Sequence, residues 1–421
     1  MSRTGDAPLV QSDQPDGRRA RQRILILSDD FKPNPGGIAE MLECLALEWS
    51  KQGVEVQVLT PWHGICEEDE PFLRLRYFSD RDRLDRGRFP RATLPIWRAR
   101  RFLLGKSNAP VFRYWRRRYY QAMLSQVRPQ MIFVGAWSPY TSQVLRDAGA
   151  LDVPVYCIAH GAEVLLYART HAERFKEDFS RYSAIICNSS FTRATIERLG
   201  IPHRDLFVTR MGVRDIRNLA PPEIPRERAI AELARNHRVI LTLGTLNPRK
   251  GVDRTLESIA SVQAKLPGDF LYVVAGDGPY RARLQSQAIA MGIAHLVHFA
   301  GRVSDRLKAE LLRSCEVLVM PSRMEQGWNV EGFGIVYLEA GLFGKPVIAG
   351  NAGGAPEAVQ NEHTGILVDP NSPAQIAAAI LRMLNSPDER GRLGAQASAN
   401  AVSLHRWDRI ASELLANCRA R

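Results

Sequence analysis

The chain has 421 residues, of which 45 % are hydrophobic and 24 % charged, and its formal charge is +12. These values are typical of a globular protein of two or three domains and exclude collagen, a disulfide miniprotein and a chain disordered throughout. The excess charge is local, because the stretch from Arg74 to Arg128 holds 16 Lys and Arg against 3 Asp and Glu.

The N-terminal end and the cysteines indicate the cellular compartment. Residues 1–22 are polar without an apolar run of signal-peptide length, so we predict a disordered tail there. No segment approaches the roughly 18 apolar residues of a spanning helix. The six cysteines lie far apart, without a C-x-x-C pair or zinc-binding spacing. We therefore expect a reduced, cytoplasmic protein without a transmembrane segment.

The first part of the chain has the pattern of a βαβ unit. Arg23–Ser28 is a short apolar run that predicts a buried parallel strand, and the glycine turn Pro35–Gly37 follows it. Apolar residues then recur at helical spacing from Ile38 to Trp49, before a second strand at Val54–Leu59. The same rhythm resumes after the basic stretch, with strands at 131–134, 155–158 and 184–187. We assign residues 23–215 to an N-terminal Rossmann-like domain.

A second unit follows a break in the pattern. Residues 216–237 are rich in proline and charge, which predicts a linker. Strand-like runs then return within residues 238–400, which we assign to a C-terminal Rossmann-like domain. Residues 401–421 are predicted to be a helix that packs back on the N-terminal domain. This alternation favours an α/β fold of two doubly wound units, with ligands bound in the cleft between them.

The most informative segment contains two glutamates, Glu331 and Glu339, eight residues apart. Eight residues are about 2.2 helical turns, but the glycines at 332 and 334 favour a loop around Glu331 and a helix around Glu339. Carboxylates accept hydrogen bonds from sugar hydroxyls, and the amides at 332–334 suit an anion. The spacing alone favours an ordinary exposed glutamate pair on a surface helix; the glycines and the flanking apolar run weigh against that.

Other polar residues also follow predicted strands. Arg249 and Lys250 come after the strand at 239–243 and suit a diphosphate, although a charged surface turn would look the same. The Gly36–Gly37 turn allows a phosphate to approach the backbone, but it lacks the full G-x-G-x-x-G motif of a nicotinamide site. His160 follows the strand at 155–158, where a cleft-lining role and a structural role fit equally well.

Together these motifs resemble the retaining GT-B glycosyltransferases of family 4. The resemblance runs from about Ile24 to the C-terminus, and the segment with the two glutamates is its most diagnostic part. The stretches around His160 and Val330 are similar to phosphatidylinositol mannosyltransferases and exopolysaccharide glycosyltransferases. The matching residues are Gly36–Gly37, His160–Gly161, Asn188–Thr192, Met211–Val213, Arg249–Gly251, Gly276–Pro279, Glu331–Glu339 and Gly353–Glu357.

The resemblance implies a GT-B architecture, in which two Rossmann-like domains face a cleft and the C-terminal one binds a nucleotide sugar. Glu331 would contact the sugar, Glu339 the ribose, and Val303 the base through its backbone, while Gly353 and Gly354 would lie near the donor. The implied catalytic residues are His160, Arg249, Lys250 and Glu331. The implied donor-binding residues are Gly36, Gly37, Arg249, Lys250, Val303, Glu331, Gly332, Phe333, Gly334, Ile335 and Glu339.

One position departs from the family. Its members commonly carry an arginine after the glycine that ends the strand before the Arg-Lys pair, whereas here Thr245 follows Gly244. A hydroxyl cannot replace a bidentate cation, so either Arg249 compensates or the diphosphate is held more weakly.

The implied reaction transfers a hexose, mannose favoured, from a nucleotide sugar to a lipid-linked or glycan acceptor. It retains the anomeric configuration and uses no metal and no cofactor. The alternative is a non-catalytic nucleotide- or polyanion-binding protein on the same scaffold. The presence of His160, Lys250 and both glutamates disfavours that alternative.

The basic stretch is also dense in aromatic residues. Its end, Arg113–Met123, suits an amphipathic helix with an apolar side of Trp115, Tyr119, Ala122 and Met123. Basic residues beside aromatics suit an anionic membrane surface, so we expect a peripheral location on the inner face of the cell membrane. Nucleic acid is the second interpretation, although we expect no such partner, and an ordinary helix with a solvated basic face is the third.

Overall fold

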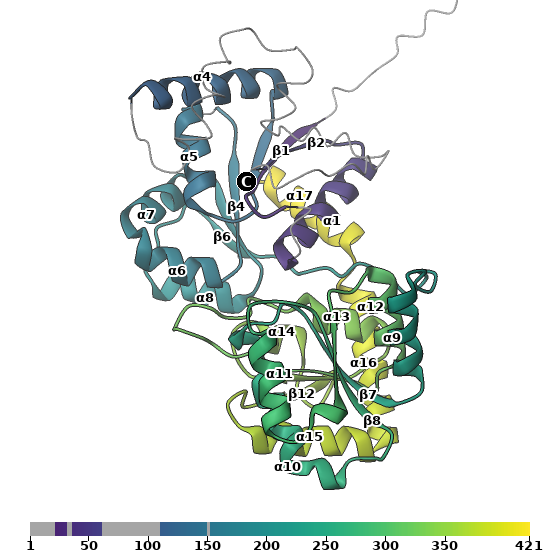
Figure 1. Ribbon diagram of the computed structural model, residues 1–421. Helices are drawn as coiled ribbons and strands as arrows, with labels where there is room; N and C mark the ends of the chain where they lie inside the picture. The colour runs from purple at the N-terminus through teal and green to yellow at the C-terminus, as the bar shows by residue number, and fades with distance from the viewer. Residues whose placement is uncertain (1–21, 32–35, 61–109, 150–151) are drawn as a thin grey trace, which may run out of the picture.

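The computed structural model describes residues 22–31, 36–60, 110–149 and 152–421. The predicted tail up to Arg21, Cys66 and the basic stretch as far as Ala109 lie outside these residues. The described chain forms two α/β units stacked end to end (Figure 1). Each unit is a six-stranded sheet with helices packed around it.

The N-terminal sheet has the strand order β2-β1-β3-β4-β5-β6, and every neighbouring pair is parallel. In the register of its centre, Ile26 of β1 lies opposite Val58 of β2 and Phe133 of β3. The strands are β1 (Arg23–Leu27), β2 (Glu55–Leu59), β3 (Met131–Val134), β4 (Val155–Ala159), β5 (Ala184–Cys187) and β6 (Leu206–Val208). The helices are α1 (Gly37–Lys51), α4 (Pro110–Val127), α5 (Pro139–Ala148), α6 (Ala162–Thr170), α7 (Ala172–Arg181) and α8 (Ser190–Arg198).

The C-terminal sheet has the order β12-β11-β10-β7-β8-β9 and is also parallel throughout. Its strands are β7 (Arg238–Leu243), β8 (Phe270–Ala275), β9 (Val297–Gly301), β10 (Val317–Met320), β11 (Val347–Gly350) and β12 (Gly365–Val368). Its helices are α9 (Pro225–Arg235), α10 (Val252–Val262), α11 (Arg281–Ala290), α12 (Asp305–Ser314), α13 (Ile335–Leu342), α14 (Ala355–Ala358), α15 (Pro373–Asn385) and α16 (Pro387–Leu404). The two parallel sheets confirm the predicted α/β class.

The stretch assigned to a linker, 216–237, contains helix α9. Pro225 stands at the first helical position, where its missing N–H costs nothing. Ile230, Ala231 and Ala234 are buried, and α9 packs against α12 and β7 of the C-terminal unit. The small apolar stripe is hidden among charged residues in the sequence, so the composition of the segment suggested a linker.

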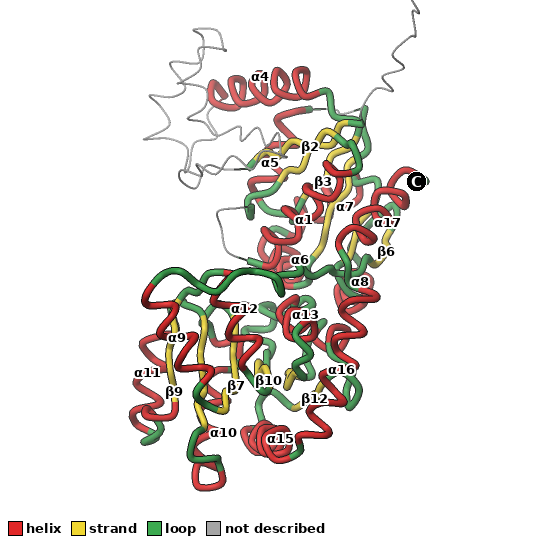
Figure 2. The backbone as a smooth tube through the Cα atoms, turned by 90° about the vertical axis from the view of Figure 1, so that its right-hand side faces the viewer, coloured by secondary structure: helices red, strands yellow, loops and turns green. Residues whose placement is uncertain are grey.

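The chain returns to the N-terminal unit through α17 (Trp407–Arg419), which follows α16 (Figure 2). This helix packs along α1, and the Trp49 Nε1–H donates to the Ala411 carbonyl at 2.9 Å. The Tyr156 hydroxyl donates to the Cys418 carbonyl near the helix end. These contacts tie the last residues of the chain to its first helix.

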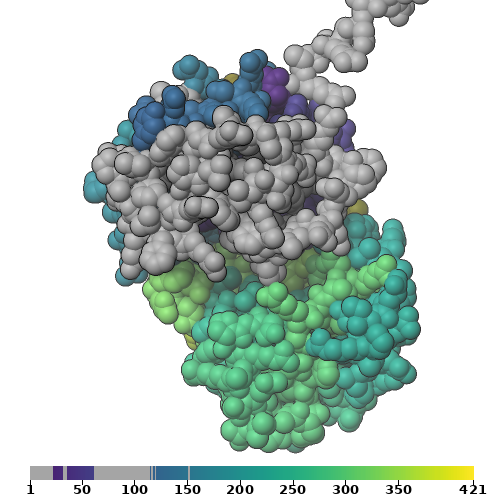
Figure 3. Space-filling view, turned by 45° about the horizontal axis from the view of Figure 1, so that its top comes forward, coloured from purple at the N-terminus to yellow at the C-terminus, as the bar shows by residue number. Residues whose placement is uncertain are grey.

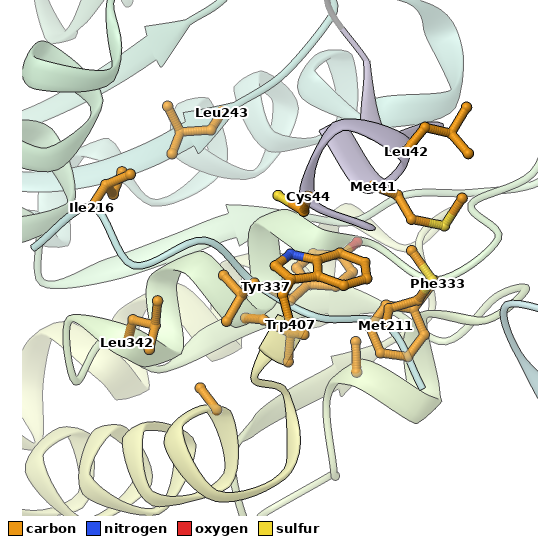
Figure 4. Packing of buried hydrophobic residues seen from close by; sticks show 14 of the residues in the cluster. Met41, Leu42, Cys44, Met211, Ile216, Leu243, Phe333, Tyr337, Leu342 and Trp407 are labelled. Atoms are coloured by element: carbon orange, nitrogen blue, oxygen red, sulfur yellow. The ribbon is translucent and has the colours of Figure 1, made fainter. Parts of the chain in front are cut away.

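One buried apolar cluster runs through both units. Figure 4 shows Met41 of α1 on the side of Phe333 of the C-terminal unit, with Trp407 packed between the units. Because protein interiors are close-packed, such a shared core joins the two units on the side where α1, α13 and α17 meet. The loops at the facing ends of the two sheets are thereby held next to each other.

The cysteines and helices of the described residues bear on two further expectations. The five cysteines of this part of the chain are free thiols with buried side chains. Among the described helices, none combines the length and apolarity needed to cross a bilayer.

Helix α4 confirms one residue of the predicted apolar side, Met123, and corrects another, Ala122. Tyr120 and Leu124 pack against the core, Met123 is buried as predicted, and Ala122, expected on the apolar side, is exposed. The side chains of Trp115 and Tyr119 lie outside the described part of the chain. The inward stripe of α4 therefore runs through Tyr120, Met123, Leu124 and Val127.

Candidate active site

The strand orders locate the candidate site. In the N-terminal sheet, β1 lies between β2 and β3, so later strands are added on both of its sides. In the C-terminal sheet, β7 lies between β8 and β10 in the same way. Ligands of such sheets bind beyond the carboxyl ends of the strands at these switch points. In this protein the loops that follow β4 and β10 meet between the units, and the predicted residues His160 and Glu331 lie on these loops.

The C-terminal half of the site is an ion cluster of Arg249, Lys250 and Glu331. Arg249 and Lys250 lie on the 3₁₀ turn Pro248–Lys250 after β7, and Glu331 lies on the loop after β10. The Lys250 Nζ is 2.6 Å and the Arg249 Nη1 2.7 Å from the same Glu331 oxygen, Oε2. All three side chains are largely buried, and the structure brings these three predicted site residues together in one ion cluster.

Burial shapes the charges of this cluster. It would raise the pKa of Glu331, but the charges of Lys250 and Arg249 outweigh it and hold that pKa at about 2. Burial lowers the pKa of Lys250, against the opposing effect of Glu331. Two cations thus share one carboxylate in a site largely closed to water. A donor diphosphate would supply the additional negative charge that this arrangement favours.

The pKa of Glu331 predicts how stability depends on pH. A carboxyl with a pKa of about 2 in the folded protein, against its ordinary 4.5, adds stability above pH 4.5 that is lost as the pH falls toward 2. We expect the melting temperature of wild type to exceed that of Glu331→Gln at neutral pH. The difference between the two melting temperatures should narrow as the pH falls from about 6 to about 3.

Thermal melts of both proteins across this range test the expectation. Glu413→Gln, which alters an exposed carboxylate on α17, serves as the control. The difference between its melting temperature and that of wild type should stay constant across the range. A difference for Glu331→Gln that is equally large at both ends of the range would contradict the prediction.

His160 forms the N-terminal half of the site. It follows β4, where its Nε2 lies 2.7 Å from the Gly135 carbonyl of the β3 loop and therefore carries the ring proton. Its backbone N–H donates to the buried Glu163 carboxylate at the start of α6. His160 is 8 % exposed, and these two hydrogen bonds hold its ring and its backbone in place.

The two halves touch at His160 and Gly332. A Cβ built on Gly332 would lie 2.0 Å from the His160 carbonyl oxygen and 2.9 Å from the Asn188 Nδ2. Only glycine allows the two backbones to approach this closely. The structure thus places the His160 backbone next to the loop that carries Glu331, while its ring is bonded to the Gly135 carbonyl of its own unit.

Further glycines shape the Glu331 loop. Gly334 caps α13 in the left-handed region, with φ of 94°. A Cβ on Gly353 would lie 2.3 Å from the Glu331 carbonyl, and one on Gly354 would lie 1.9 Å from the Gly332 carbonyl. The family resemblance implies that Gly353 and Gly354 lie near the donor. In the structure, their lack of a side chain allows α14 to approach this loop.

Phe333 and the glycine turn before α1 complete the predicted donor set. The Phe333 side chain is buried, with its ring centroid 5.9 Å from that of His405, so only its backbone is available to a ligand. Gly36 caps α1 in an extended conformation, and a Cβ on Gly37 would lie 3.8 Å from the Ile335 Cδ1. The first turns of α1 and α13 therefore face each other across the boundary.

Glu339 lies inside α13 and binds a lysine that the sequence analysis missed. The Lys308 ammonium donates to the Glu339 carboxylate and lies 3.4 Å from the Asp305 Oδ1. Burial opposes the charge on Lys308, but Glu339 and Glu40 outweigh it and raise the pKa of Lys308. Lys308 lies one turn into α12, just after β9. The feature of the sequence that could have identified Lys308 is its position shortly after a predicted strand.

This second ion cluster also joins the two units. Burial, followed by the charge of Glu339, raises the pKa of Glu40 on α1. The Arg214 guanidinium, on the segment between the units, donates to Asp305 and has its Nε 3.8 Å from the Glu40 Oε1. The predicted ribose position, Glu339, is therefore surrounded by charged side chains from both units.

Val303 and Thr245 lie beside these clusters. Val303 precedes α12 and packs partly buried against the same core as Ile335. Thr245 is exposed, and the preceding Gly244 lies against the Lys250 side chain, with its Cβ position 3.5 Å from the Lys250 Cε. The absent arginine at 245 leaves Arg249 and Lys250 as the cations of this loop that contact Glu331.

Solved structures show the same architecture. Sucrose-phosphate synthase from Thermosynechococcus elongatus superposes with a TM-score of 0.72 over 95 % of this chain and 99 % of that chain, at 20 % identity. Anabaena Alr3699/HepE in complex with UDP and glucose gives a TM-score of 0.72 over 95 % and 100 %, at 19 % identity. The fold is therefore GT-B, two Rossmann-like units facing each other.

Sequence comparisons identify the family. The pattern described as Glycosyltransferase Family 4 matches residues 35–216, and that of Glycosyl transferases group 1 matches residues 223–399. The chain is 30 % identical over 392 residues to a Mycolicibacterium smegmatis protein, the GDP-mannose-dependent alpha-(1-6)-phosphatidylinositol monomannoside mannosyltransferase, covering 91 % of this chain and 95 % of that relative. The Mycobacterium tuberculosis protein of the same description is 29 % identical over 411 residues, 93 % of this chain and 97 % of its own. The protein belongs to the GT-B glycosyltransferases of family 4.

Proposed function

We propose that this protein transfers mannose from GDP-mannose to a phosphatidylinositol-based or other lipid-linked glycan acceptor. The observation that carries the proposal is the largely buried cluster of Arg249, Lys250 and Glu331, whose loop meets the His160 backbone across the boundary of the two units. It is supported by relatives along nearly the whole chain whose names specify GDP-mannose as donor and phosphatidylinositol monomannoside as acceptor.

The proposed reaction retains the configuration at the anomeric carbon. The bond from this carbon to the diphosphate breaks, and the acceptor oxygen attacks from the same face while the leaving phosphate oxygen takes its proton. Negative charge grows on the departing diphosphate, and Arg249 and Lys250 lie ready to stabilise it without a metal ion. Glu331 would orient the sugar by accepting hydrogen bonds from its hydroxyls.

The direct test incubates the purified protein with a panel of GDP- and UDP-sugars and phosphatidylinositol mannoside acceptors. We expect transfer from GDP-mannose, the same rate with a chelator present, and an α-linked product by NMR. Nucleotide binding without transfer or hydrolysis of any donor would favour the non-catalytic alternative. Inverted configuration in the product would overturn the proposed stereochemistry.

The outer face of α4 supports a peripheral membrane location. Arg117 and Arg118 are exposed, Tyr114 is 53 % exposed, and the Arg118 guanidinium lies 5.7 Å from the centroid of the Tyr114 ring. In Figure 3, α4 (blue) lies at the end of the N-terminal unit, away from the C-terminal unit (green). Arginine beside an interfacial aromatic suits an anionic lipid surface, which is where a lipid-linked acceptor would be met.

We expect Arg117→Glu/Arg118→Glu to weaken binding to vesicles of anionic lipid at least about tenfold, since each basic residue near the surface contributes about 1 kcal/mol. Sedimentation with phosphatidylglycerol vesicles at low salt measures the effect. The charge-matched control is Lys176→Glu/Arg181→Glu on α7, which exposes its cations elsewhere on the same unit. Equal losses of vesicle binding for the two double variants would contradict a membrane contact through α4.

A further inference from the structure

A carboxylate of the C-terminal unit caps a helix of the N-terminal unit. Glu357 lies on α14, yet its Oε2 accepts a hydrogen bond from the Ser190 N–H at 2.9 Å, and its Oε1 accepts one from the Phe191 N–H at 3.0 Å. These are the first two residues of α8, whose N–H groups have no acceptor within the helix. The partial positive charge of the helix N-terminus also favours a carboxylate there.

On one side, this contact continues into the Glu331 loop. The Gly354 N–H, just before α14, donates to the Glu331 carbonyl at 2.9 Å. The close approaches of Gly353 and Gly354 to the Glu331 and Gly332 carbonyls press the same segment against the loop. Glu357 and Glu331 thus belong to one closely bonded part of the C-terminal unit.

On the other side, the contact continues to a polar side chain at the site. Ser189 caps α8 by accepting from the Thr192 N–H at 3.2 Å. The hydroxyls of Thr192 and Ser189 donate to the Asn188 Oδ1, at 2.8 and 3.2 Å. The Asn188 Nδ2 is thereby directed to Gly332, beside the His160 carbonyl. The start of α8 therefore holds the side chain that meets the Glu331 loop.

We propose that Glu357 is a positioning residue that holds the two halves of the active site together. Its carboxylate joins α8, Asn188 and His160 to the Gly353–Glu357 segment and the Glu331 loop, so that the reacting groups of both units keep one geometry. Hydrogen bonds to a charged acceptor are about twice as strong as neutral ones, which suits a contact that must form between separate units. The inference rests on the proposed function for its catalytic consequence only.

Two variants remove the contact from opposite sides. Glu357→Ala removes the acceptor, and Ser190→Pro removes one donor. Proline is favoured at the first helical position, and Ser189 before it has φ of −162° and ψ of 159°, which a following proline tolerates. Each variant is expected to lower kcat about tenfold, because small displacements of reacting groups are costly. The donor Kd from calorimetry stays within about threefold, since Arg249, Lys250 and Glu331 belong to the C-terminal unit.

The combination of variants separates positioning from a general loss of stability. The double variant should be no slower than the slower single variant, because both changes break one contact. Glu357→Gln, which keeps one acceptor oxygen, should recover part of the rate. Glu197→Ala removes a carboxylate that pairs with Arg193 within α8 and should keep the wild-type kcat. Additive losses, or a wild-type kcat in Glu357→Ala, would overturn the proposal.

A measurement without any sugar donor tests the contact itself. In Glu357→Ala, amide hydrogen exchange at Ser190 and Phe191 should be at least about tenfold faster, and small-angle scattering should show a larger radius of gyration. Unchanged exchange and an unchanged radius would overturn the proposal even if the enzyme transfers mannose. If wild type transfers no sugar but these two signals change, the proposed function fails and the contact between the units stands.

Discussion

Replacing Lys250 by alanine is expected to lower the rate of sugar transfer by about 10²- to 10³-fold, the usual cost of removing one preorganised group that stabilises a leaving anion. The Lys250 ammonium is buried, lies 2.6 Å from Glu331 and shares that carboxylate with Arg249. Glu331 keeps Arg249 in the variant, so the fold retains an ion pair while the leaving diphosphate loses one of its two cations.

The measurement is kcat together with the melting temperature of each variant. Lys265→Ala, which removes an exposed lysine of the same unit, is the matched control and should keep both values. Glu331→Ala should lose turnover to a similar extent, because it removes the predicted sugar contact. Wild-type turnover in both Lys250→Ala and Glu331→Ala would exclude the assigned site.

Much of the site was predictable because parallel strands end at one edge of a sheet. Polar residues after 239–243 and after 317–320 were separated by about 80 residues in sequence, yet strand order brings Lys250 and Glu331 into one ion pair. The glycines at 332 and 334 indicated a loop around Glu331, and the structure adds that Gly332 closely approaches the His160 backbone. Local pattern and fold class were sufficient for these residues.

Contacts between the units were not predictable from local patterns. In the sequence Glu357 only ends the short motif Gly353–Glu357, whereas in the structure its oxygens bind the amides of α8, more than 160 positions away in the chain. Lys308 and Glu40 gain their importance only because α12 and α1 are brought to Glu339. The signal for such residues lies in the packing of one unit on the other.

The orientation of α4 shows a different limit. Its sequence contains two overlapping apolar stripes at helical spacing, one through Trp115 and Tyr119 and one through Tyr120, Leu124 and Val127. Periodicity alone cannot choose between them, since both fit an amphipathic helix. Among the side chains that the structure describes, those of the second stripe pack against the N-terminal core, whereas Tyr114, Arg117 and Arg118 are exposed.

The close approach of the two units at Gly332 supplies the last prediction, that Gly332→Ala lowers kcat at least about 100-fold with little change in donor affinity. A Cβ at this position would lie 2.0 Å from the His160 carbonyl oxygen, a backbone atom that no side-chain rotation can move. The units must therefore separate at the point where the reacting groups meet. The donor is expected to keep its contacts with Arg249 and Lys250, which are in the C-terminal unit.

Calorimetry with the donor and steady-state kinetics on the same preparation test this separation of binding from turnover. Gly391→Ala is the matched control: it adds a Cβ with no atom within 4 Å, in the interior of α16. It should keep the wild-type rate and gain roughly 0.5–1 kcal/mol of stability, since alanine favours a helix over glycine. If Gly332→Ala lost donor affinity and turnover in equal measure, the damage would lie within the C-terminal unit rather than at its contact with His160.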